Sequence, residues 1–308
     1  EPGGIGRVYG EFLGIERRES QGVLRAIASV HGLLIERSHK VWSFSHLTFQ
    51  EYLVAKYIIG NQEVEELVVR HLTDEYWLEI FKLVSELMSE FGKAEYLLLK
   101  IEEKIQDYIC TPRLQTILYW VDEITIGSHS NINLVAKRAA ALFIFILLAI
   151  ACGFRHNFAR TRHLIIDLLL IYNSDLAGLF DYTLVFITDI RQDFSLSLSL
   201  AKTVQELNLF NISSNLFDEI NDLELTIAGD SNKIHEIEGD DIETIALRTW
   251  LSVLEVELDM IYFTPIESQF IDNLIYASKV MVLCKAVARE FTPKTWKQIE
   301  NNMLKLIE

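Results

Sequence analysis

The sequence predicts a mainly α-helical chain with one short β-hairpin near its start and a large multi-helix domain after it. Only four prolines and fourteen glycines interrupt 308 residues, half of which are hydrophobic. So few residues that break regular structure favour long helices over many short strands. Apolar side chains recur at three- and four-residue intervals through most of the chain, as they do along one face of a helix. The length is enough for one large or two ordinary domains with a sizeable core.

The first expected element is a helix over Ile15–Val30. Gly32 follows it closely, and glycine is the usual residue just after a helix end. The glycine-rich residues 1–14 before the helix lack the Gly-Lys-Ser/Thr sequence of a phosphate loop, and we interpret them as a linker or turn. The side chains expected on the buried face of the helix are Val23, Leu24, Ile27 and Val30.

Two short strands and a second helix are expected next. Leu33–Arg37 and Val41–Phe44 flank a three-residue turn, which predicts a hairpin. A helix is expected from Thr48 to Ile59, because Thr48 and Glu51 have the spacing of a capping box. A helix, a hairpin and a helix in this order form the latter half of a winged helix.

From residue 61 onward the pattern is helical. The clearest internal boundary after Gly60 is the loop Thr125–Asn133, so we expect three units: a winged-helix half at 1–60, a helical linker subdomain at 61–125 and a C-terminal helical domain at 126–308. An acidic loop is expected at Gly229–Asp241. The expected helices are Val64–Leu72, Trp77–Phe91, Lys93–Tyr108, one beginning at Pro112, Ala139–Phe154, Thr161–Tyr172, Leu176–Ile190, Ser195–Leu209, Leu216–Ile227, Ile242–Tyr262, Glu267–Phe291 and Pro293–Ile307.

The most apolar stretch is Ala139–Phe154, which has sixteen residues without a charge. As a helix it would be ~24 Å long at 1.5 Å per residue, short of the ~30 Å hydrocarbon core of a bilayer. We therefore favour a helix buried at the centre of a helical domain. A membrane effector that uses this stretch is the alternative.

The charge of the chain indicates which kinds of partner it can bind, and its cysteines indicate the redox compartment in which it folds. The net charge is −16, yet residues 1–60 carry seven basic and six acidic side chains, so the acidity lies in the remainder. Such a surface repels phosphate backbones, and we expect no nucleic-acid partner. Cys110, Cys152 and Cys284 offer no disulfide framework or zinc spacing, which fits a reduced, cytoplasmic setting.

The basic residues that a DNA-binding winged helix would use are Arg17, Arg18, Arg25, Arg37 and Lys40.

One stretch is more specific than its periodicity. Phe44–Ala55 reads Phe-Ser-His-Leu-Thr-Phe-Gln-Glu-Tyr-Leu-Val-Ala. It resembles the winged-helix element of NACHT-type STAND NTPases, nucleotide switches that include animal NLR receptors and many bacterial defence proteins. His31–Arg37 looks like the wing strand before that motif. The C-terminal helices, around Tyr276–Lys279 and Ile299–Leu304, resemble helical domains that follow NACHT modules in bacterial proteins.

The resemblance implies a role for one residue, His46. In the family, the histidine of this motif contacts the β-phosphate of ADP and helps to hold the inactive state. The P-loop and the acidic magnesium site of the family are absent from this sequence and are expected upstream of Glu1, in a longer protein. We therefore expect no catalytic residue, metal site or bound cofactor in this chain, and ATP or ADP with magnesium in the full-length protein.

The function implied is the regulatory or sensor portion of a NACHT switch, in bacterial anti-phage defence or signalling. Its expected partners are the upstream NACHT nucleotide-binding domain, a sensed ligand that the sequence does not identify, and further copies of the chain after activation. No membrane partner is expected. The alternative hypothesis is a DNA-binding winged helix joined to a helical oligomerisation domain.

Overall fold

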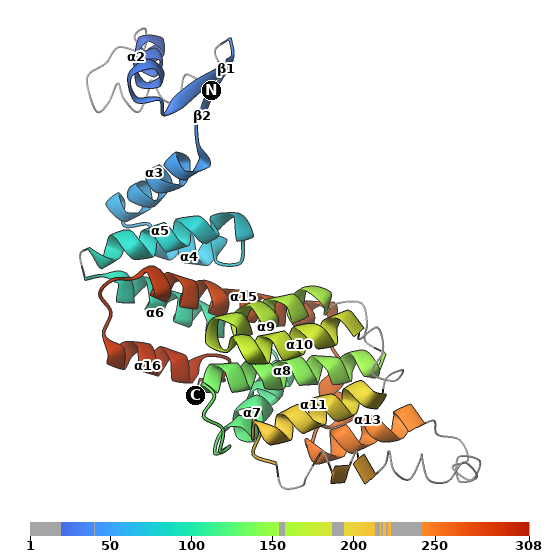
Figure 1. The fold of residues 1–308 in the computed structure, drawn as a ribbon. Helices are drawn as coiled ribbons and strands as arrows, with labels where there is room; N and C mark the ends of the chain where they lie inside the picture. Colours follow the sequence, from blue (N-terminus) through green and yellow to red (C-terminus); the bar gives the residue numbers. More distant parts are fainter. Residues whose placement is uncertain are drawn as a thin grey trace.

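The fold is a tall stack of helices with a small hairpin unit at one end (Figure 1). It is seen in a computed structural model, which describes residues 20–39, 41–90, 92–153, 158–186, 194–212, 216, 218, 219, 221, 222 and 242–307. The glycine-rich residues 1–14 and the predicted acidic loop 229–241 lie outside this described part. So does most of the predicted helix Leu216–Ile227.

The N-terminal unit has the predicted helix and hairpin. Helix α2 (Ser20–Ala26) continues into the π-helical turn η2 (Ile27–His31), and Gly32 ends it with a positive φ of 63°. Strands β1 (Leu34–Ser38) and β2 (Val41–Phe44) then pair in antiparallel fashion. This confirms the predicted hairpin.

One side chain of the first helix was placed wrongly by the sequence. Leu24 is buried as predicted, but Val30 is 73% exposed. The regular α-helix stops at Ala26, and the wider π turn after it has a different angular spacing of side chains. Val30 therefore falls off the stripe that regular helical spacing assigned to it.

Helix α3 (Leu47–Gly60) connects the hairpin unit to the rest of the chain (Figure 1). The predicted capping box at its start is wrong. His46 is the N-cap, with extended backbone at φ −133° and ψ 142°, and the Phe49 N–H donates to the His46 carbonyl over 3.3 Å. The first turn thus closes before Thr48, which lies inside the helix. Thr264 and Glu267, at the start of a later helix, do form a capping box.

The remaining elements form the helical body and match most of the predicted helices to within a few residues. Pro112 stands in the first turn of its helix as predicted, and the alternating Ser-Leu sequence after residue 194 is helical. The elements are α4 (Val64–His71), η3 (Glu75–Trp77), α5 (Leu78–Ser89), α6 (Ala94–Gln106), α7 (Pro112–Thr125), α8 (Leu134–Ala151), α9 (Ala159–Tyr172), α10 (Ser174–Phe186), α11 (Phe194–Glu206), α13 (Ile242–Val253), α14 (Leu258–Ile261), α15 (Pro265–Val287) and α16 (Pro293–Asn302).

The predicted single helix Ile242–Tyr262 is in fact two helices, α13 and α14. Between them Glu255 has a positive φ of 54°, and the Val256 N–H donates to the Leu251 carbonyl over 2.9 Å. This six-residue hydrogen bond across a left-handed residue is the Schellman ending of a helix. The apolar stripe continues past the break, which is why its periodicity suggested one element.

Helix α8 lies at the centre of the body, against α7, α9, α13, α14 and α16. Almost every side chain on it is buried, as the core hypothesis for Ala139–Phe154 predicts. Among the described residues, α8 is the one helix long and apolar enough to cross a membrane, and 94% of its eighteen residues are buried inside the structure. The absence of a membrane partner stays a prediction.

One buried cluster of apolar side chains runs from α3 to the end of α16. Helix α15 joins its parts, because it packs against α5 and α6 on one side and against α9 on another. The C-terminal helices thus touch the helices expected in the linker subdomain. The domain boundaries at residues 60 and 125 stay predictions.

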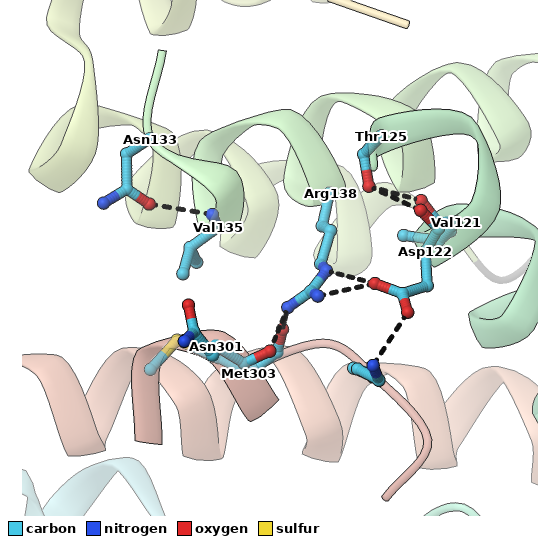
Figure 2. A network of polar contacts seen from close by, with 9 residues as sticks. Val121, Asp122, Thr125, Asn133, Val135, Arg138, Asn301 and Met303 are labelled. Atoms are coloured by element: carbon cyan, nitrogen blue, oxygen red, sulfur yellow. Dashed lines mark hydrogen bonds and ion pairs between the residues drawn. The ribbon is translucent and has the colours of Figure 1, made fainter. Parts of the chain in front are cut away.

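A buried polar network fastens the C-terminal segment to this core (Figure 2). Arg138 on α8 is 1% exposed and donates to Asp122 on α7 and to the carbonyls of Asn301 and Met303, the latter two over 2.7 and 2.8 Å. Lys305 adds an ion pair to the second oxygen of Asp122 at 3.0 Å. The end of α16 and the chain after it are therefore held by Arg138 and by the ion pair of Lys305 with Asp122.

Candidate functional site

His46 stands at the junction between β2 and α3. The Ser45 N–H donates to the Leu33 carbonyl over 2.9 Å, which joins the two open ends of the hairpin directly before His46. The His46 side chain is exposed and makes no capping hydrogen bond to the helix. Its imidazole is therefore available to a group that approaches from outside the described part of the chain.

The surroundings of His46 suit an anion. The ring lies edge-on to Phe49, with 5.8 Å between the ring centroids. It also stands at the N-terminus of a fourteen-residue helix, where unpaired backbone N–H groups and the helix dipole favour negative charge. These features place an imidazole N–H and a positive helix end side by side, which is a suitable arrangement for a phosphate oxygen.

Helix α3 is apolar on two faces. Ala55 and Ile58 are buried on the face that packs against α5. The other side carries large apolar side chains that remain well exposed, and a helix that is apolar all round is normally buried all round. These side chains are Phe49 at 39%, Tyr52 at 42%, Leu53 at 47% and Tyr57 at 62% exposed. We call this set the outer face of α3.

The sequence analysis did not reveal that these four side chains form a second, uncovered face. A signal was available. Between Leu47 and Gly60 the polar side chains are too few to make a solvent-facing stripe. A helix with that composition on the surface of a domain requires a neighbour on both sides.

The other candidate residues remain apart from this site. Of the five basic residues named for DNA binding, Arg25 and Arg37 are exposed, and Arg37 donates to the Ser43 hydroxyl over 2.9 Å. The other three lie outside the described residues. His31 and His39 are exposed as well, and no group of three metal-ligating side chains occurs in the part of the chain that the structure describes.

Comparison with known proteins bears on this same region. The family model of the winged helix-turn-helix domain C-terminal to NACHT matches residues 17–58, from the first helix through the hairpin to the last turn of α3. No curated protein and no solved structure matches the chain. The matched range includes His46, the hairpin and the outer face of α3. Residues 17–58 are therefore similar to the winged helix-turn-helix domain that lies C-terminal to NACHT.

Proposed function

We propose that this chain is the non-catalytic, regulatory C-terminal part of a NACHT nucleotide switch, and that His46 holds the switch in its ADP-bound, inactive state. The exposed imidazole at the N-cap of α3, within the matched winged helix, carries this proposal. Its partner is an upstream NACHT nucleotide-binding domain, which binds the ATP or ADP with magnesium.

The contact we propose is a hydrogen bond from the His46 imidazole to the β-phosphate of ADP. An imidazole N–H is a donor in either tautomer, and the N-terminus of α3 adds its backbone dipole at the same point. A phosphate held by both groups would fix the winged helix against the nucleotide. The hydrogen bond then exists only while the two modules are docked, so it stabilises the closed state selectively.

The outer face of α3 is the surface on which we propose that the NACHT domain docks. It begins one turn after His46, so a module whose phosphate reaches the imidazole would also cover Phe49 and Tyr52. Covering large apolar side chains supplies affinity, and the histidine supplies dependence on the nucleotide. In this scheme the opposite face of the helix, with Ala55 and Ile58, transmits the docked state to α5.

Activation is a shift in population between two states. A ligand met by the helical body favours an open, ATP-bound form that assembles into oligomers, at the cost of the contacts made in the closed form. We place this switch in the cytoplasm, in bacterial anti-phage defence or signalling, without a nucleic-acid or membrane partner. Plating efficiency of phages on cells with the intact gene and with its His46→Ala variant tests the defence role.

The decisive experiment uses the full-length protein, purified with its nucleotide. A hydrogen bond to a charged group contributes about 1.5–3 kcal/mol, so His46→Ala should weaken ADP binding about 10- to 150-fold and raise basal signalling. His39→Ala is the matched control, because His39 is an exposed histidine at the hairpin turn, away from α3. Unchanged ADP retention together with unchanged basal activity would reject the role of His46.

A further inference from the structure

A cavity of about 380 Å³ opens between α7 and the break that separates α13 from α14. Its apolar wall includes Trp120, Ile124, Leu254 and Met260, which are all buried. This volume lies within the range of pockets that hold a ligand or a side chain of a partner. Neither the winged helix nor the proposed nucleotide contact involves this part of the molecule.

Specific hydrogen bonds hold the walls of the cavity in place. The indole N–H of Trp120 donates to the Leu254 carbonyl over 2.8 Å, which joins α7 to the end of α13. The Asn211 N–H donates to the Ile124 carbonyl over 2.6 Å and fixes a third segment beside them. The cavity is thus bounded by elements far apart in the sequence that are fastened to one another.

The open side of the cavity is negatively charged. Glu123 and Glu255 line it and are exposed, and the lining includes no lysine or arginine. Glu257, the last residue before α14, and Asp259, in the first turn of α14, are exposed too. Within the described residues none of these four carboxylates has an ion-pair partner. An apolar cavity with an uncompensated acidic rim favours a ligand that combines a cation with an apolar stem.

A basic side chain that contacts the start of α14 is already engaged. Arg113 on α7 makes an ion pair of 3.0 Å with Glu267 and donates to the Asp259 carbonyl over 3.2 Å. Its ion pair is with Glu267, and among the residues that the structure describes it makes none with the carboxylates of Glu123, Glu255, Glu257 or Asp259. The negative charge at the rim is left for a group from outside the described part of the chain.

We propose that this cavity receives a lysine or arginine side chain from a protein partner, on a segment with apolar neighbours. Tyr119, 60% exposed, lines the opening beside Trp120, so an aromatic ring and two carboxylates are available to one cation. The methylene stem of the same side chain would pack on the apolar wall. Leu258, at the start of α14 and also 60% exposed, extends the apolar surface beside the acidic side chains, which suits a peptide segment better than a small cation.

This inference rests on the proposed function for its regulatory consequence, since it names the chemistry of the partner that the switch would sense. The binding itself does not depend on His46. In the full-length His46→Ala protein the cavity should bind its ligand as in the wild type. Loss of the nucleotide effect and loss of the cavity effect are therefore separate results.

The test is selection of a random heptapeptide library displayed on phage against the full-length protein. The selected peptides should carry lysine or arginine next to apolar residues. A representative peptide should bind at least about tenfold more weakly to the Glu123→Gln, Glu255→Gln double variant. The matched control is the Glu90→Gln, Glu290→Gln double variant, which removes the same charge from exposed carboxylates elsewhere and should bind as the wild type does.

Three outcomes would overturn the proposal. In the first outcome, the selected peptides lack an excess of basic residues. In the second, the peptide binds the Glu123→Gln, Glu255→Gln variant as tightly as the Glu90→Gln, Glu290→Gln control. In the third outcome, free agmatine would bind as tightly as the best peptide, which would point to a small cation instead of a protein. Equal unfolding temperatures for the two double variants establish that any difference between them arises at the cavity.

Discussion

Arg138 on α8 and Asp122 on α7 form a buried ion pair, in which Nε and Nη2 of the guanidinium donate to the same carboxylate oxygen over 3.1 and 2.5 Å. Asp122 is 8% exposed, so both charges have left bulk water. The pair also holds the end of the chain, because Nη1 of Arg138 donates to the carbonyls of Asn301 and Met303.

Removal of Asp122 should therefore destabilise the helical body strongly. Asp122→Ala leaves a buried guanidinium without its counter-charge, and we expect the free energy of unfolding to fall by about 3–5 kcal/mol. Urea denaturation of the full-length protein measures this. Glu79→Ala breaks an exposed ion pair with Lys82 and should cost no more than about 1 kcal/mol. Equal effects of the two variants would contradict the importance of the buried pair.

Glu267 should make stability depend on acid pH. Burial raises the pKa of this carboxyl, but hydrogen bonds from the Thr264 N–H and hydroxyl, followed by the hydrogen bond and charge of Arg113, outweigh it, so the pKa lies below its ordinary value of 4.5. A carboxyl whose pKa is lower in the folded than in the unfolded chain stabilises the fold at pH values above its unfolded pKa. This contribution is lost as the pH falls through the folded pKa.

The stability gap between wild type and Glu267→Gln should thus be constant at neutral pH, about 1.5–3 kcal/mol for a charged hydrogen-bonded group. It should shrink as pH falls below about 4.5. Denaturation midpoints measured at pH 7, 5, 4 and 3 test this. Glu290→Gln, at an exposed position, serves as control. A gap that stays constant down to pH 3 would show that the folded pKa of Glu267 is not lowered.

Cys110 and Cys284 should differ in reactivity. Cys284 is fully buried, and burial raises the pKa of its thiol, so little reactive thiolate forms. Cys110 is exposed. Iodoacetamide labelling followed by mass spectrometry should modify Cys110 first, and Cys284 only after addition of denaturant. Rapid labelling of native Cys284 would show that α15 opens readily from its contacts with α5 and α6.

Substitutions on the two faces of α3 should have different effects. Ile58→Asp places a charge against α5 and should lower the unfolding temperature of the full-length protein markedly. Tyr57→Asp, on the outer face, should leave that temperature nearly unchanged but weaken ADP retention, if this face docks on the NACHT domain. Normal ADP retention in Tyr57→Asp would remove the outer face from the docking surface.

Much of the fold could be predicted from the sequence, since local signals defined it. Gly32, Pro112 and the apolar period of Leu97, Ile101 and Ile105 each act within one turn of their own element. The errors also came from local signals. Thr48 has the right spacing for a cap, but the extended backbone of His46 starts the helix earlier. The stripe through Leu254 and Leu258 hid the left-handed turn at Glu255.

What the sequence could not predict depends on contacts across long separations. Arg138 directly precedes the uncharged stretch Ala139–Phe154 in the sequence, yet it lies inside the core, where the carbonyls of Asn301 and Met303 accept its hydrogen bonds. The same holds for the candidate site. His46 was found from its motif, whereas the exposure of Phe49 and Tyr57 depends on which face α5 covers.

The burial of α8 has a consequence for synthesis of the protein on the ribosome. The helix is complete at Ala151, but α16, which helps to cover it, begins only at Pro293. At 5–20 residues per second the chain between them takes roughly 7–28 s to make. During that interval an eighteen-residue apolar helix awaits its late neighbours, and we expect the nascent chain to need a chaperone until α16 emerges.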